Sequence, residues 1–129
     1  MILIDTDIVI DHFHGHQAAL DHLSDALAAG ETLAVSVVTV TELLGGMRAG
    51  EEDRTERLLD MFYIIDVNEA ISRTAGFYLR QYRRSHNMDF GDALIAATAQ
   101  DTVAILYTRN IRHYPMDDIT VKLPYKRGK

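Results

Sequence analysis

The sequence contains no cysteine and only two prolines among its 129 residues. Without cysteine the chain has no disulfide, no thiolate zinc site and no cysteine nucleophile, so any metal must be bound by oxygen or imidazole ligands. The sequence also lacks a run of eighteen apolar residues, and its N-terminus lacks the basic region and cleavage site of a signal peptide. We therefore expect a cytoplasmic protein without a membrane partner.

The net charge is −6, whereas proteins that bind nucleic acid more often have a basic surface. The basic residues are nevertheless clustered, in residues 80–84, 109–112 and 126–129. A site that gathers carboxylates around a divalent cation would account for part of the acidic excess. The charge balance is therefore compatible with a nuclease, although it does not favour one.

The order of strand and helix patterns predicts an α/β fold. Short apolar runs predict strands at residues 2–5, 33–37, 62–65, 103–107 and 119–123. Helical patterns predict a helical region up to residue 30, a helix from residue 39, and helices at residues 52–59, 68–86 and 90–100. Such alternation forms a parallel sheet covered on both faces, with ligands bound at the carboxyl ends of the strands. We expect one domain over residues 1–129, with a mobile basic tail from about residue 124.

Three acidic residues fall at the expected active edge of this sheet. Asp5 ends the first predicted strand, and Glu42 and Asp92 lie in the first turns of two predicted helices. Each has an ordinary structural explanation, because acids cap helix N-termini and are stabilised near them. Three acids at one edge of one sheet nevertheless predict a shared carboxylate site.

Glu42 has the strongest structural alternative. The spacing Thr39-x-x-Glu42 is typical of a capping box, in which both side chains serve the start of a helix. Against this, Gly45 and Gly46 lie beside Glu42 on the helix face, and glycine inside a helix costs about 1 kcal/mol relative to alanine. The bare surface predicts that a backbone or a ligand packs closely there.

Carboxylates that share a site repel one another unless a cation lies between them. Oxygen ligands favour Mg²⁺ or Mn²⁺. Such an ion lowers the pKa of water, orients a phosphate and stabilises the leaving oxygen. The residues therefore predict metal-assisted phosphoester chemistry.

Four motifs in order resemble the PIN domain, and in particular the VapC-type toxins of toxin–antitoxin pairs. They are ILIDTD at 2–7, TELLGG at 41–46, DALIAA at 92–97 and LYTRN at 106–110. The resemblance implies a three-layer α/β/α sandwich with a central parallel sheet of four to five strands, and a homodimer. It also implies an Mg²⁺- or Mn²⁺-dependent endoribonuclease that is restrained by a cognate antitoxin, with the choice among transfer, ribosomal and messenger RNA left open.

The same resemblance implies roles for individual residues. Asp5, Glu42 and Asp92 match the acidic triad of the family, which implies that they bind the metal and carry catalysis. Asn110 matches the position of a fourth family acid, so we include it in the catalytic set as an amide. A further acid often precedes the next aromatic residue, where this chain has His113.

Five residues are candidates for binding the RNA. Thr6 and Thr108 follow predicted strands and could bind a phosphate or a water, although ordinary turns also explain them. The other three candidates are Arg80, Arg84 and Arg109. Arg80 and Arg84 belong to a cluster in which arginines alternate with aromatic residues, an arrangement that suits binding of phosphates and stacking of bases. A solvated basic helix face is the competing interpretation.

Two other functions remain possible from the residues. Asp5-Thr-Asp-Ile-Val also fits the opening of haloacid-dehalogenase-like phosphatases, with Asp5 as nucleophile, but that leaves Glu42 and Asp92 unused. A receiver-like signalling module would accept phosphate on Asp66, and it also gives Glu42 no role. A PIN-like domain without catalysis is a third possibility, because the fourth acid is missing.

Overall fold

Strand β1 (Ile2–Ile4) lies at the centre of a five-stranded parallel sheet in the computed structural model, which describes residues 1–125. The strand order is β3-β2-β1-β4-β5, and every neighbouring pair is parallel. The other strands are β2 (Leu33–Ser36), β3 (Tyr63–Ile65), β4 (Ile105–Tyr107) and β5 (Thr120–Lys122). The predicted parallel sheet is therefore confirmed, with the later strands added on both sides of the first.

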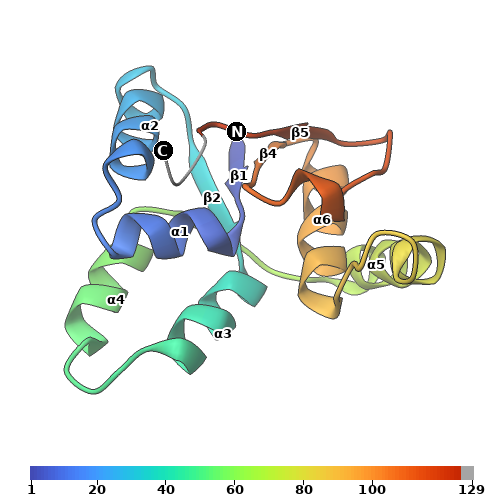
Figure 1. Ribbon diagram of the computed structural model, residues 1–129, viewed down its shortest axis with the longest axis horizontal. Helices are drawn as coiled ribbons and strands as arrows, with labels where there is room; N and C mark the ends of the chain where they lie inside the picture. The colour runs from blue at the N-terminus through green and yellow to red at the C-terminus, as the bar shows by residue number, and fades with distance from the viewer. Residues whose placement is uncertain (126–129) are drawn as a thin grey trace.

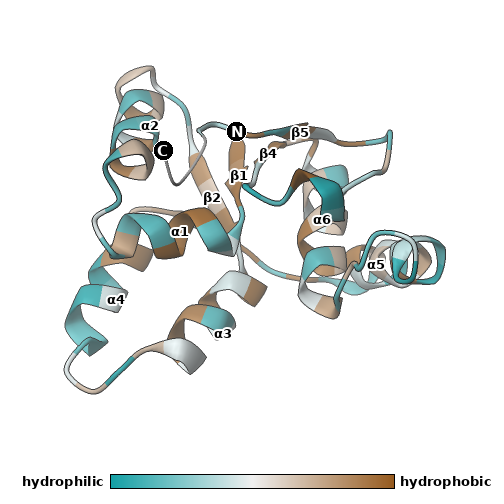
Figure 2. Cartoon of the chain, viewed as in Figure 1, coloured by the Kyte–Doolittle hydropathy of each residue, from teal (hydrophilic) through white to brown (hydrophobic). Residues whose placement is uncertain are grey.

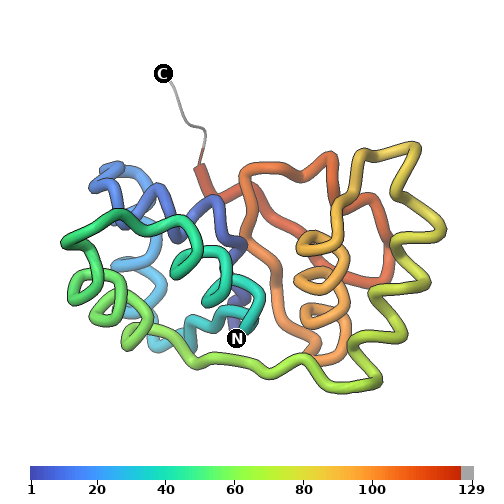
Figure 3. Tube along the Cα trace, turned by 90° about the horizontal axis from the view of Figure 1, so that it is seen from below, coloured from blue at the N-terminus to red at the C-terminus, as the bar shows by residue number. Residues whose placement is uncertain are grey.

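Helices cover both faces of the sheet. The helices α1 (Thr6–Phe13), α2 (Gln17–Ala28), α3 (Val37–Gly46) and α4 (Glu52–Leu59) gather on one side, and α5 (Glu69–Tyr82) and α6 (Phe90–Thr102) lie on the other (Figures 1 and 3). A short 3-10 helix, η1 (Ile111–His113), follows β4. The expected three-layer α/β/α sandwich is confirmed.

Alternate residues of the central strands face opposite layers, as the pleat of a strand requires. Leu3, Ala34 and Leu106 are buried with α5 and α6, whereas Ile2 and Ile4 are buried with the helices of the other layer. The inner strands are accordingly apolar on both faces, and hydrophilic residues colour much of α4 (Figure 2). None of the helices within residues 1–125 combines the length and the apolar character that crossing a bilayer needs.

Two predicted helix boundaries are wrong. The helix that carries Glu42 begins at Val37 rather than Thr39, because the Ser36 side chain caps it by accepting a hydrogen bond from the Val38 N–H at 3.0 Å. The long helix α5 is capped by Asn68, and it ends at Tyr82 rather than near residue 86.

The C-terminal segment is bound to the domain as far as Tyr125. Its ring lies 5.5 Å from the His16 ring and 5.6 Å from the His22 ring, and its hydroxyl donates to Asp11 Oδ2 at 2.8 Å. The mobile tail that we predicted from about residue 124 remains a prediction, since most of it, residues 126–129, lies outside the described residues.

Candidate active site at the carboxyl edge of the sheet

Asp5 lies directly after β1 and caps α1. One carboxylate oxygen accepts the Thr6 N–H at 2.8 Å, and the other accepts the hydroxyls of Thr108 at 2.7 Å and Tyr114 at 2.9 Å. The side chain is buried, with 5% of the residue exposed. Asp5 can therefore cap α1 and also belong to the candidate active site, because the cap uses one carboxylate oxygen and the other faces β4 and the segment after η1.

Asp92 lies in the first turn of α6 and forms a capping box with Asp89. Asp89 Oδ1 accepts the Asp92 N–H at 2.7 Å, and Asp92 Oδ2 accepts the Asp89 N–H at 3.2 Å. The same Oδ2 lies 3.1 Å from His113 Nδ1, while Oδ1 lies 3.3 Å from the Tyr114 hydroxyl. This capping box directs Asp92 towards Tyr114.

Tyr114 brings Asp5 and Asp92 together. Its hydroxyl oxygen is within hydrogen-bond distance of both carboxylates, yet a hydroxyl has a single hydrogen to donate. Burial is the largest cause of a raised pKa at Asp5. Burial, together with the charges of Asp89 and Asp5, raises the pKa of Asp92 to about 6. This pair of acids has more negative charge than the surrounding donors satisfy.

Asp7 extends the negative cluster. Its Oδ2 accepts the Arg109 N–H at 3.0 Å, whereas its Oδ1 is buried and has no hydrogen-bond partner within residues 1–125. Burial, followed by the charge of Asp5, raises the pKa of Asp7 to about 6. A buried carboxylate oxygen without a partner is costly, and a bound cation would satisfy it.

Glu42 reaches the cluster through a pair of threonines. The Thr6 hydroxyl hydrogen-bonds to Glu42 Oε1 at 2.5 Å and lies 2.8 Å from the Thr39 hydroxyl. Thr39 is fully buried inside α3 rather than at its start. The capping-box interpretation of Thr39 and Glu42 is therefore wrong, and both side chains instead point towards the beginning of α1.

Gly91, rather than Gly45 or Gly46, is the glycine that lies against Glu42. A Cβ built on Gly91 would be 3.2 Å from Glu42 Oε2, whereas a Cβ on Gly45 or Gly46 would meet open space. No backbone of the described residues therefore packs against Gly45 or Gly46, and the alternative that a ligand packs there remains a prediction. The missing side chain at Gly91 lets the start of α6 approach the Glu42 carboxylate.

The residues predicted to bind substrate have different environments. The Thr108 and Thr6 hydroxyls contact Asp5 and Glu42, so both are engaged in positioning acids. Arg109 directs its Nε to the buried Asp11 at 2.9 Å.

The other two arginines and Asn110 lie further out. Arg80 is exposed on α5, with its guanidinium carbon 6.0 Å from the centre of the Phe77 ring. Arg84 lines a hollow beside η1. Asn110 is exposed, and its N–H donates to Thr108 Oγ1 at 3.0 Å. The predicted roles of these three residues remain predictions.

Four residues of the cluster were not in the predicted site: Asp7, Asp89, His113 and Tyr114. Asp89 caps α6, and its charge also acts on Asp5 and Asp92. His113 and Tyr114 occur close after the LYTRN motif, where the family resemblance places a further acid and an aromatic residue. That position was the signal that could have identified them.

The donor set suits a hard divalent cation. Asp5, Asp7 and Asp92 offer carboxylate oxygens, one of which has no other partner. No group of three acidic or histidine side chains within residues 1–125 converges closely enough to bind a metal without rearrangement. Glu42 is directed towards Thr6, so it must turn to join a cation shared by Asp5 and Asp92.

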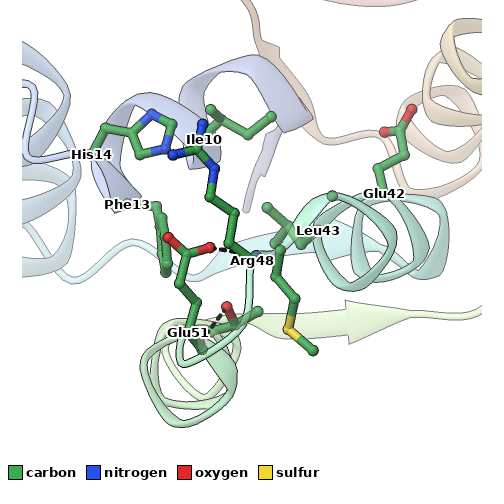
Figure 4. A pocket seen from close by; sticks show the side chains of 10 residues that line it. Ile10, Phe13, His14, Glu42, Leu43, Arg48 and Glu51 are labelled. Carbon is green, nitrogen blue, oxygen red and sulfur yellow. Dashed lines mark hydrogen bonds between the residues drawn. The ribbon is translucent and has the colours of Figure 1, made fainter.

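A groove begins at Glu42 and runs between α1, α3 and α4. Its volume is about 190 Å³, and Ile10, Phe13, Leu43 and Met47 give it an apolar lining. Glu42 lies at one end of the set of residues that line the groove, away from Glu51 and the side chain of Arg48 (Figure 4). The groove therefore joins an apolar surface to one member of the acidic cluster.

The family model of the PIN domain matches residues 2–119. Ribonuclease VapC10 of Mycobacterium tuberculosis is 48% identical over 117 residues, which cover 90% of this chain and 87% of the relative. Ribonuclease VapC19 of the same species is 42% identical over 90% of this chain and 94% of the relative.

Solved structures also contain chains that are similar to this one. A chain of the toxin–antitoxin complex from Klebsiella pneumoniae is 31% identical, with a TM-score of 0.75 and coverage of 98% of this chain and 99% of that one. A chain of VapBC-1 from nontypeable Haemophilus influenzae has a TM-score of 0.78 over 98% of this chain and 100% of that one, and at 22% identity it supports the fold alone.

Proposed function

Because the chain belongs to the PIN-domain family, we propose that it is a metal-dependent endoribonuclease and the toxin of a toxin–antitoxin pair. The observation that carries the proposal is the approach of Asp5 and Asp92 to one hydroxyl at the carboxyl edge of the sheet. Relatives named as ribonucleases support the choice of RNA as substrate. RNA is present in the cytoplasm, so the proposed activity belongs there.

Asp5, Asp92 and Glu42 would bind Mg²⁺ or Mn²⁺ in this proposal. The ion would supply positive charge for the phosphodiester and lower the pKa of the attacking water. Thr108 and Tyr114 orient the Asp5 carboxylate by donating to the same oxygen, and Thr6 orients Glu42. The Thr108 and Tyr114 hydroxyls fix Asp5 before the substrate arrives, which reduces the reorganisation needed at that ligand during the reaction.

The two competing functions fit the geometry less well. As a phosphatase nucleophile, Asp5 would act without Asp92, yet the Tyr114 hydroxyl lies within hydrogen-bond distance of both acids, and the PIN-domain model matches residues 2–119. As a phosphate acceptor, Asp66 would need neighbouring acids, but it is exposed after the edge strand β3, and β2 lies between that strand and β1.

Cleavage of a panel of structured RNAs with Mg²⁺ or Mn²⁺ tests the proposal. Wild type should cleave, whereas Asp5→Asn and Asp92→Asn should lose activity by at least about 100-fold, because each removes a charge from the metal site. Asp66→Asn is the matched control and should cleave like wild type. Equal cleavage by all four proteins would overturn the mechanism, and a mass gain with a small phosphodonor that depends on Asp66 would favour the signalling function.

We propose that the groove between α1, α3 and α4 receives an apolar segment of the antitoxin. The groove is open, Ile10 is 38% exposed in it, and it leads to Glu42, so a bound segment could act on the site directly. The toxin–antitoxin complex among the similar structures supports a partner of this kind.

Co-expression with the product of a small reading frame adjacent to the gene tests this partner. Ile10→Glu should abolish co-purification, because it places a charge in an apolar contact. Leu27→Glu, on the exposed face of α2 at 44% exposure, should leave co-purification intact. Equal capture of both variants would contradict the assigned groove.

The proposed homodimer predicts a mass in light scattering of twice the 14.5 kDa of the chain.

A further inference from the structure

A basic hollow of about 500 Å³ lies beside the acidic cluster. It is formed where the segment after α5 faces η1 and the residues that follow it. Arg84, His86 and Asn87 line one side, and Arg112, His113 and Tyr114 line the other. The hollow therefore brings together basic side chains from two segments that are distant in the sequence.

The two arginines of this hollow have no acidic partner among the described residues. None of its lining residues is acidic. Arg84 and Arg112 make no ion pair or side-chain hydrogen bond within residues 1–125, whereas Arg109, which precedes η1 in the sequence, is paired with the buried Asp11. In a chain with a net charge of −6, these two guanidinium groups form a local positive region that is available to a ligand.

The hollow shares a wall with the candidate active site. His113 and Tyr114 both line it, and both contact Asp92, at 3.1 Å and 3.3 Å. Tyr114 also donates to Asp5. A chain ligand with one phosphate at the acids would therefore have neighbouring phosphates close to Arg84 and Arg112.

The chemistry of the proposed reaction requires such a region. An RNA backbone is repelled by Asp5, Asp7, Asp89 and Asp92 wherever their charge exceeds that of the bound metal. Arginine offsets this repulsion well, because its planar guanidinium donates two parallel hydrogen bonds to a phosphate. Contacts of this kind fix the register of a strand without reading its sequence.

We propose that Arg84 and Arg112 bind backbone phosphates of single-stranded RNA adjacent to the scissile bond. This inference rests on the proposed ribonuclease function and adds the route by which the strand leaves the acids, along the hollow between α5 and η1. Arg84 and Arg112 are positioning residues, since they act on phosphates that do not react.

Fluorescence anisotropy with a labelled, mixed-sequence, single-stranded 20-nucleotide RNA tests the proposal. Asp5→Asn protein with magnesium serves as the parent, so that binding is measured without cleavage. Adding Arg84→Gln and Arg112→Gln to this parent should weaken RNA binding roughly 10- to 100-fold at moderate salt. The slope of log K against the logarithm of the salt concentration should become smaller by about 1.4, since each single-strand phosphate contact contributes about 0.7. Arg84→Lys with Arg112→Lys should preserve most of the salt slope.

The matched control removes the same charge elsewhere. Arg57→Gln with Arg73→Gln changes two exposed arginines outside the hollow and should alter affinity by less than about 3-fold. Equal losses in both double variants would overturn the proposal, because net charge alone would then explain binding. Weakened capture of the antitoxin with unchanged RNA affinity would overturn it in favour of a protein ligand.

Kinetics distinguish this inference from the proposed function. In an otherwise wild-type chain, the Arg84→Gln and Arg112→Gln pair should raise KM and leave kcat within about 3-fold, because the contacts are equal in the ground and transition states. Cleavage with unchanged KM would overturn the phosphate subsite while leaving the ribonuclease function intact. A parent protein that binds no RNA and a wild type that cleaves none would overturn both. Circular dichroism melting of each variant checks that it is folded.

Discussion

The Tyr114 hydroxyl donates to Asp5 Oδ2 at 2.9 Å, across 109 residues of sequence. The Tyr114 hydroxyl oxygen also lies 3.3 Å from Asp92 Oδ1, so one hydrogen is available to two acids. Tyr114 is itself buried, and burial together with the charges of Asp5 and Asp92 raises its pKa well above the usual value. It therefore remains a neutral donor at physiological pH, and it orients Asp5 without adding charge to the cluster.

Tyr114→Phe should reduce RNA cleavage by roughly 10- to 100-fold, as is typical when a group that orients a metal ligand is removed. The loss should be partly restored at high magnesium, because the Asp5 carboxylate remains but is less well oriented. Cleavage rates over a magnesium titration measure this. Tyr78→Phe is the control, since its hydroxyl contacts Asp118 away from the cluster, and it should leave the rates unchanged. Identical titrations for the two variants would contradict the role of Tyr114.

The stability of the metal-free protein should fall as the pH rises from about 4 to about 6. The pKa of Asp7 and that of Asp92 are each raised from 3.8 to about 6, so both acids lose their protons at lower pH in the unfolded chain than in the folded one. Their contribution is therefore fully present below pH 3.8 and is lost as the pH passes about 6. Magnesium should reverse the loss, because it stabilises the ionised acids.

Urea denaturation in EDTA across this pH range measures the effect. Asp7→Asn should remove a pH-dependent loss of about 1–3 kcal/mol. The exposed Asp66→Asn should preserve the wild-type pH dependence. The metal-free stability of the wild type could instead rise steadily from pH 4 to pH 6, with the same slope in Asp7→Asn. That result would refute the raised pKa assigned to Asp7.

Gly91→Ala should separate activity from stability. The new Cβ would lie 3.2 Å from Glu42 Oε2, so the carboxylate must move, although its flexible side chain allows this at little energetic cost. We expect a free energy of unfolding equal to or above wild type, because alanine favours a helix, together with a loss of cleavage of roughly tenfold. Gly76→Ala on α5 meets open space and should stabilise the fold without changing cleavage. Full activity in Gly91→Ala would show that the position of Glu42 is not critical.

Tyr125→Phe should destabilise the fold by about 1–3 kcal/mol, since it removes a donor from the carboxylate of Asp11, of which 2% is exposed. Arg109 remains paired with Asp11 at 2.9 Å, so the loss should be smaller than that of Asp11→Ala. Thermal or urea denaturation measures both variants. Tyr63→Phe, at a residue that is 63% exposed, should change stability by less than about 0.5 kcal/mol, and an equal effect in the two tyrosine variants would contradict this contact.

Local sequence patterns predicted the parallel sheet and the positions of Asp5 and Asp92, because strand runs and helix starts depend on neighbouring residues. They did not predict the start of the helix before Glu42, since both Ser36 and Thr39 are good caps and only tertiary packing buries the second. The pairing of Arg109 with Asp11 could not be predicted, because Asp11 is 98 positions away in the sequence and becomes a neighbour only in the fold. The contact of Arg109 with substrate remains a prediction.

The Tyr114 and Thr108 contacts with Asp5 also have a consequence for the order of synthesis. Strand β1 is made before β4, and the hydroxyls that orient Asp5 come 103 and 109 residues after it. At about 5–20 residues per second, a ribosome needs roughly 5–20 s to cover that distance. A nascent chain that has not yet reached Thr108 and Tyr114 therefore has Asp5 without these donors, and the acidic centre is completed only after this interval of synthesis.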